Sequence, residues 1–106
     1  MDASRARAEQ LLTLSSAARR ISDLIAASEA PLRYEVMRHL VRVSEEDLID
    51  TLQEATAAKL IRRGPDPFTY VPFDEETGVA IRDCMDEPRL TRLRTHIAGA
   101  ASRVFE

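Results

Sequence analysis

The sequence predicts a mainly α-helical domain that carries one small β-hairpin. Its 106 residues suit a single domain with a modest core. Apolar residues recur at helical spacing along most of the chain, and only residues 60–73 replace that pattern with a turn and a run of aromatic and β-branched residues. Apolar residues make up 44% and charged residues 31%, which is typical of globular proteins and not of disordered chains.

The first periodic stretch runs from about Ser4 to Ala27. One helix face would carry apolar residues spaced by three and four positions, which are Leu11, Leu14, Ala18, Ile21 and Ile25. Ser15 and Ser16 are good N-cap residues, so the stretch is either one helix or two helices with a break there. Residues 1–28 are therefore predicted to form one or two N-terminal helices.

Two further helices are predicted over residues 31–59. Pro31 suits the first turn of a helix, where its missing N–H costs nothing. That helix would bury Leu32, Val36, Leu40 and Val41 and leave Arg33, Arg38 and Arg42 in solvent. Ser44 is the clearest helix start in the sequence, because its hydroxyl can cap free N–H groups and three acidic residues follow it, as the helix dipole favours. This third helix should end near Lys59.

The β-hairpin is predicted over residues 60–73. Leu60 and Ile61 precede the turn of residues 64–67, and the run of residues 68–73 favours a strand. Pro72 cannot donate a ladder hydrogen bond, so this strand should be an edge strand that ends there. Three helices followed by a small hairpin is the order of a winged helix. Residues 31–73 are therefore predicted to form a winged-helix core, with the hairpin as its wing.

Residues 74–106 predict two helices beyond that core. Asp74 can cap the first of them, whose apolar face would consist of Thr77, Ala80, Ile81, Cys84 and Met85. Pro88 opens the second, and its apolar positions are again spaced by three and four: Leu90, Leu93, Ile97, Ala100 and Val104. The predicted fold is thus a single domain over residues 1–106, a winged helix-turn-helix with extra N- and C-terminal helices.

No pattern typical of catalysis is present in the sequence. The three glycines are too far apart for a P-loop or a dinucleotide-binding fingerprint, and two histidines with one cysteine are too few for a Cys/His zinc site. We interpret His39 as a partly buried structural residue, His96 as a solvated residue and Cys84 as a small core residue. We therefore expect no catalytic residue, metal, cofactor or small-molecule ligand.

The sequence also predicts a cytoplasmic protein without a membrane partner. No apolar run approaches the roughly 18 residues that span a bilayer. The first residues lead into an amphipathic stretch and not into the apolar stretch of a signal peptide. A single cysteine cannot form an internal disulfide, so nothing indicates an oxidising compartment.

The charge distribution decides between partners. The net charge is −3, and residues 45–58 hold five acids and no base. This third helix is the one a winged helix normally places in the major groove, where its carboxylates would face phosphates. Only Gln53 is of a type that commonly reads bases there. DNA binding stays an alternative through a basic face made of Arg33, Arg38, Arg42, Arg62 and Arg63.

Three segments resemble a known family. Residues 44–52 (SEEDLIDTL) and 57–62 (AAKLIR) resemble the winged-helix segment that follows the ATPase core in STAND-class regulators, including large LuxR-type activators, and residues 92–98 (RLRTHIA) are similar to its Arg-rich last helix. The resemblance covers about residues 30–106. It departs at Pro72, where the family has histidine, and at His96, two places beyond the family's histidine. The ATPase core is absent, and the resemblance implies a module that relays state through protein contacts.

We therefore expect a non-enzymatic regulatory or adaptor module that acts through protein–protein contacts as a homodimer. A winged-helix core needs only the three middle helices and the hairpin, so the terminal seams of residues 11–25 and 90–104 are free to pair between subunits. The other interpretation of these seams is that both pack onto their own core. A dimeric DNA-binding transcriptional regulator is the second predicted function. A fragment of a larger STAND protein, with no independent role, is the third.

Overall fold

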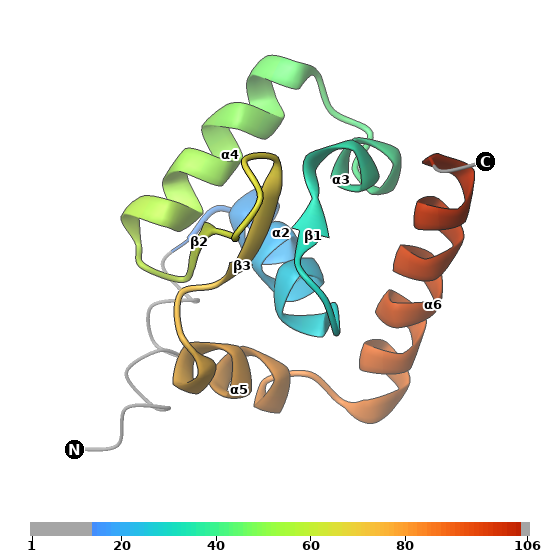
Figure 1. Ribbon diagram of the computed structural model, residues 1–106. Helices are drawn as coiled ribbons and strands as arrows, with labels where there is room; N and C mark the ends of the chain where they lie inside the picture. Colours follow the sequence, from blue (N-terminus) through green and yellow to red (C-terminus); the bar gives the residue numbers. More distant parts are fainter. Residues whose placement is uncertain (1–13, 105–106) are drawn as a thin grey trace.

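The computed structural model describes residues 14–104, which form five helices and a three-stranded antiparallel sheet (Figure 1). In chain order the elements are α2 (Ser16–Ala27), β1 (Leu32–Arg33), α3 (Tyr34–Leu40), α4 (Glu45–Ala57), β2 (Ile61–Arg63), β3 (Thr69–Pro72), α5 (Glu75–Asp83) and α6 (Glu87–Val104). The predicted fold class, mainly helical with a small hairpin, is confirmed.

Helix α2 runs through the middle of the molecule (Figure 1). Ser15 caps it by accepting a hydrogen bond from the Ala18 N–H, so a helix start at Ser16 is confirmed. The helix contacts α4, α5, α6 and β3. Because neighbours surround it, nearly all of its apolar side chains are buried, and Ile21, Leu24 and Ile25 are among them.

Residues 31–33 correct the sequence-based prediction. A helix was expected from Pro31, but Leu32 and Arg33 form strand β1 and the helix begins only at Tyr34. Strand β1 pairs with β3, and the Tyr34 N–H donates to the Phe68 carbonyl at 2.8 Å. The ring of Pro31 fixes a φ that suits extended backbone as well as a helix start. The pairing with a distant strand therefore decides the conformation of this segment.

The strand order is β1-β3-β2, so β3 is the central strand and its predicted edge position is wrong. It does end at Pro72, as predicted. In the ladder between β2 and β3, the Gly64 N–H donates to Thr69 O and the Phe73 N–H donates to Leu60 O. Because such hydrogen bonds alternate along an antiparallel strand, the backbone nitrogen of Pro72 faces β1 and not β2. The ladder between β1 and β3 stops at Tyr70. The missing N–H of Pro72 consequently falls beyond the end of β1 and leaves no ladder bond unmade.

Helix α4 begins and ends as predicted. The Ser44 hydroxyl accepts a hydrogen bond from the Asp47 N–H at 3.1 Å. At the other end Lys59 has a φ of 59°, and the Leu60 N–H donates to Ala55 O at 3.1 Å. This bond, with that from the Lys59 N–H to Thr56 O, forms a Schellman motif whose left-handed position is held by lysine instead of the usual glycine.

Helices α5 and α6 begin where the sequence predicted, but one residue predicted to lie in the core is exposed. Asp74 accepts from the Thr77 N–H at 2.7 Å, and Pro88 lies in the first turn of α6. Ala80 and Ile81 are buried as expected. Cys84, however, is exposed, so its prediction as a core residue is wrong. It is the C-cap of α5, one residue beyond the last residue of the helix.

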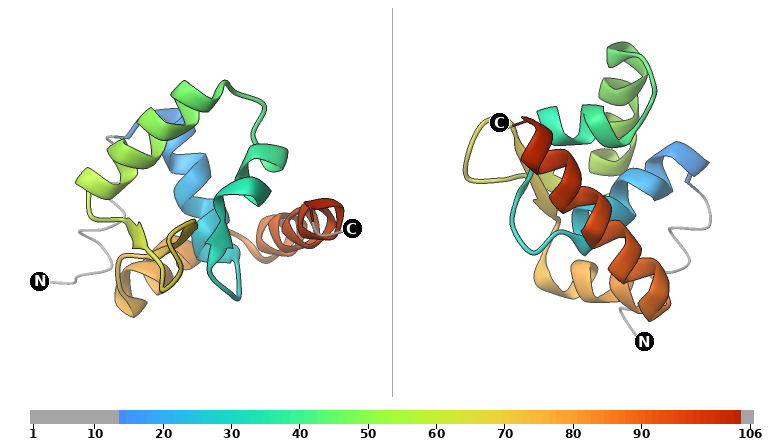
Figure 2. Two further views of the ribbon diagram at one scale, coloured as in Figure 1. Left: turned by 45° about the horizontal axis from the view of Figure 1, so that its top comes forward. Right: turned by 90° about the vertical axis from the view of Figure 1, so that its right-hand side faces the viewer.

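The core lies where α2, α4 and the inner face of the sheet meet. Its buried apolar side chains include Ile21, Leu24, Ile25, Leu32, Val36, Met37, Val41, Leu48, Leu52, Ala55, Leu60, Ile61 and Ile81. Helix α6 lies along the outside of α2 and α3 (Figures 1 and 2). In residues 14–104, no helix combines the length and the hydropathy that a bilayer crossing requires.

Candidate interaction groove

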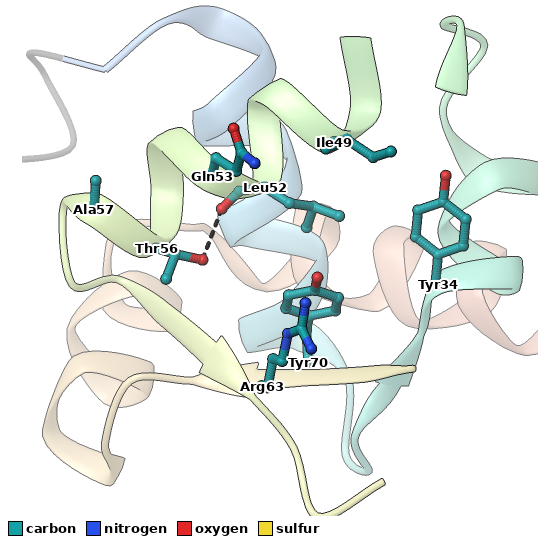
Figure 3. A pocket seen from close by; sticks show the side chains of 8 residues that line it. All are labelled: Tyr34, Ile49, Leu52, Gln53, Thr56, Ala57, Arg63 and Tyr70. Carbon is teal, nitrogen blue, oxygen red and sulfur yellow. Dashed lines mark hydrogen bonds between the residues drawn. The ribbon is translucent and has the colours of Figure 1, made fainter. Parts of the chain in front are cut away.

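A groove of about 490 Å³ separates α4 from the sheet (Figure 3). Helix α4 supplies one wall, β2 and β3 supply the other, and Tyr34 at the start of α3 flanks it. Its lining residues are Tyr34, Ile49, Leu52, Gln53, Thr56, Ala57, Arg63 and Tyr70. Within this set, only Gln53 and Arg63 were considered from the sequence as possible DNA contacts.

The α4 wall of the groove carries no charge. Ile49, Gln53 and Thr56 recur at four and three residues and so share one side of the helix. The Ile49 side chain is 43% exposed, whereas Leu52 is buried beneath it. The Thr56 hydroxyl donates to the Leu52 carbonyl at 2.7 Å, a bond drawn in Figure 3. This wall therefore offers an apolar surface with amide and hydroxyl groups at its margin.

Three of the five carboxylates of α4 lie on the outer side of the helix. Asp47, Asp50 and Glu54 line a second hollow, next to the start of α2. There the Ser15 hydroxyl donates to Glu54 Oε2 at 2.6 Å. Glu46 is exposed one turn before Ile49 and shares its side of the helix, although it does not line the groove. The outer side of α4 is therefore acidic, and Glu45 and Glu46 lie at the N-terminal end of its groove side.

The sheet wall carries Arg63 and Tyr70. The two residues are cross-strand partners, and both point from the sheet toward α4 (Figure 3). Arg62 pairs with Val71, one position along the ladder, so its side chain leaves the opposite face of the sheet. Among residues 14–104, the Arg63 guanidinium has no hydrogen-bond or ion-pair partner.

An acidic group stands at the Tyr34 end of the groove. The Tyr34 hydroxyl donates to Glu45 Oε1 at 3.2 Å, and Arg38 Nη1 lies 3.6 Å from Glu45 Oε2. Partial burial, together with the Glu45 carboxylate, raises the pKa of the Tyr34 phenol above its ordinary value of 10.0. The phenol is therefore a protonated hydrogen-bond donor at neutral pH.

The five arginines predicted to form one DNA-binding face do not share a face. Arg33 lies opposite Thr69 and thus on the same side of the sheet as Arg62, whereas Arg63 lies on the other side. Arg38 is paired with Glu45, and Arg62 Nε donates to the Phe73 carbonyl at 3.0 Å. Arg42 is exposed. The alternation of side chains along β2 therefore separates Arg63 from Arg33 and Arg62, and DNA contact by these arginines stays a prediction.

The predicted dimer interface is wrong for α2. Ala18, Ile21 and Ile25 are 0%, 1% and 1% exposed within a single chain, so no second subunit can reach them. Leu14 is half-buried against the same core, and Leu11 lies outside the described residues. The α6 seam packs on its own chain too. Ala100 is buried, and the remaining seam residues, Leu90, Leu93, Ile97 and Val104, are half-buried.

The residues considered for other chemistry are solvent-exposed. His39 is exposed, so its prediction as a partly buried residue is wrong, while His96 is exposed as predicted. The described part of the chain has no group of three His, Cys, Asp or Glu side chains arranged to hold a metal ion. Comparisons with models of protein families, with curated proteins and with solved structures found no match.

Proposed function

We propose that this protein is a non-enzymatic winged-helix regulatory or adaptor module, and that the groove between α4 and the hairpin is its protein-binding surface. The order helix, strand, helix, helix, strand, strand supports the winged-helix assignment, as does the position of β3 between β1 and β2. In this assignment α4 is the third helix and β2 and β3 form the wing. The resemblance of residues 30–106 to the STAND-class segment agrees with it.

The composition of the groove carries the proposal. Two tyrosines and a partly exposed isoleucine line it, and Arg63 is the single charged residue of the lining. Aromatic residues, arginine and a scarcity of other charges distinguish the centres of protein–protein interfaces. A surface that binds a nucleic-acid backbone instead gathers several Lys and Arg side chains, because each contact neutralises one phosphate.

The outer side of α4 opposes the DNA-binding alternative. Asp47, Asp50 and Glu54 are all exposed there, on the helix that a winged helix places in the major groove. Their carboxylates would face a duplex that bears one negative charge per roughly 1.7 Å of its axis. Repulsion of this kind is long-ranged at low salt, so it would oppose even nonspecific binding.

The proposal does not depend on a homodimer. The α2 seam expected to pair subunits is buried in the core, and α6 covers its own chain with its apolar side. That the chain forms a homodimer stays a prediction. Light scattering at tens of micromolar protein measures the mass in solution, and a monomeric mass would rule that prediction out.

Binding to random-sequence duplex DNA tests the proposed function. We expect no measurable affinity by fluorescence anisotropy at about 50 mM salt, where phosphate contacts are strongest. Affinity that falls tenfold or more between about 50 and 200 mM salt would indicate several phosphate contacts. That result would contradict the adaptor proposal in favour of a DNA-binding regulator.

A further inference from the structure

We propose that the groove binds a partner segment that carries a carboxylate next to a large apolar side chain. The carboxylate would pair with Arg63, and the apolar side chain would lie against Ile49, Leu52 and Tyr70. This inference rests on the proposed function, because it assigns a partner chemistry to the same groove.

The unpaired charge of Arg63 determines the polar part of the partner. Its guanidinium meets no carboxylate among residues 14–104, and no acidic residue lines the groove. The ring of Tyr70 is its cross-strand neighbour, and the uncharged side of α4 lies across from it (Figure 3). The Arg63 side chain is exposed, so its guanidinium is accessible to a partner. It presents a planar set of donors that fits a carboxylate in a bidentate manner.

The α4 wall determines the apolar part of the partner. Ile49 is one of the few large apolar side chains left substantially exposed in the described chain. With buried Leu52 below it and half-buried Tyr70 opposite, it surrounds a volume of about 490 Å³. Pockets of this size commonly enclose small ligands, so the groove suits one or two side chains of a short segment. Burying Ile49 beneath such a segment would remove apolar surface from water.

The charges at the two ends of the groove give the partner a direction. Because the strand order is β1-β3-β2, Tyr70 lies between Tyr34 on the β1 side and Arg63 on the β2 side. The Tyr34 end holds Glu45 paired with Arg38, so its two charges largely cancel, whereas the unpaired Arg63 at the other end attracts acids. An acidic residue of the partner is therefore expected only at the β2 end.

Selection from a display library of random peptides against the full chain tests the inference. We expect enriched peptides to carry Asp or Glu within a few positions of Leu, Ile or an aromatic residue. A synthetic copy of one such peptide should bind the Arg63→Glu variant about fivefold more weakly, the upper range for a partly exposed ion pair. Arg62→Glu is the matched control. It makes the same charge change on the opposite face of the same strand and should keep wild-type affinity.

A charge exchange makes the test specific. The same peptide with Lys in place of its acidic residue should bind Arg63→Glu more tightly than it binds the wild type. Equal losses in Arg62→Glu and Arg63→Glu would overturn the inference, as would enrichment of peptides that lack acids or failure to enrich any peptide. If acid-free peptides lose binding in Ile49→Glu, the groove is still a protein-binding surface. In that case the proposed function stands without the carboxylate. Unchanged urea unfolding of each variant would show that the fold is retained.

Discussion

The guanidinium of Arg82 donates a hydrogen bond from Nη1 to the carbonyl oxygen of Ala26 at 2.9 Å, from α5 to the last turn of α2. Arg94 of α6 does the same for the next carbonyl, with its Nε 3.0 Å from Ala27 O. The last carbonyls of a helix have no partner within the helix, and the negative end of the helix dipole lies there. One arginine from α5 and one from α6 thus supply hydrogen-bond donors to the last two carbonyls of the central helix, α2.

The first prediction concerns this arrangement. Arg82→Met removes the charged donor but keeps much of the aliphatic stem, so it should lower the free energy of unfolding by about 1–2 kcal/mol. Urea unfolding followed by circular dichroism measures the change. Arg92→Met is the matched control, because Arg92 is exposed on α6 and forms no bond within the described residues. Equal losses in the two variants would contradict the structural role of Arg82.

The second prediction concerns the apolar seam of α2. Ile21 is 1% exposed in the single chain, so Ile21→Ala should leave a cavity and lower the free energy of unfolding by about 2–4 kcal/mol. The urea midpoint of the wild type should not change with protein concentration. An obligate dimer held by this seam would show a midpoint that rises with concentration. Val79→Ala, at a 40% exposed position, should change stability little.

The elements that could be predicted are those determined by neighbouring residues. Ser44 and Asp74 were predicted as N-caps because a hydroxyl or carboxylate next to an acidic first turn satisfies local donors, and the structure places both at helix starts. The hairpin was likewise predicted from its turn residues and its β-branched residues. Strand β1 could not be predicted, because Leu32 and Arg33 become a strand only through pairing with residues almost forty positions away.

The candidate site was less predictable for a similar reason. An apolar seam on a helix indicates only that the face is covered, and it does not distinguish the helix's own chain from a second subunit. Arg62 and Arg63 adjoin in sequence, and only the register opposite Val71 and Tyr70 reveals that they serve different faces. Tyr34 and Ile49 carried no signal beyond helical spacing. Alternation along the predicted strand could have separated the two arginines.

The third prediction concerns the end of α4. Lys59 has a φ of 59°, a conformation that costs a residue with a side chain roughly 1 kcal/mol and costs glycine almost nothing. Lys59→Gly should therefore raise the free energy of unfolding, by up to about 1 kcal/mol. Lys59→Ala, which retains a Cβ at the same φ, should bring no such gain. A loss of stability in Lys59→Gly, measured by urea unfolding, would argue against the left-handed conformation.

The fourth prediction concerns Asp23 of α2, whose side chain is 16% exposed. Arg89 Nη2 lies 2.8 Å from its Oδ2 atom. Burial raises the pKa of this carboxyl above its ordinary value of 3.8, and the opposing effects of Arg89 and Arg19 are smaller. The folded protein thus holds this proton more tightly than the unfolded chain. The stability that it contributes is fully present below the unfolded pKa and is lost as the pH rises through the folded pKa.

Asp23→Asn has no charge to desolvate, so it should become more stable relative to the wild type as the pH rises through that window. Asparagine can still accept the hydrogen bond from Arg89, which limits the structural change. Urea unfolding of both proteins at intervals between about pH 3 and pH 7 gives the difference directly. An NMR titration of the Asp23 carboxyl should show a pKa above 3.8. A difference that stays constant with pH would mean that attraction to Arg89 balances burial, and a difference that reverses would mean that attraction outweighs burial.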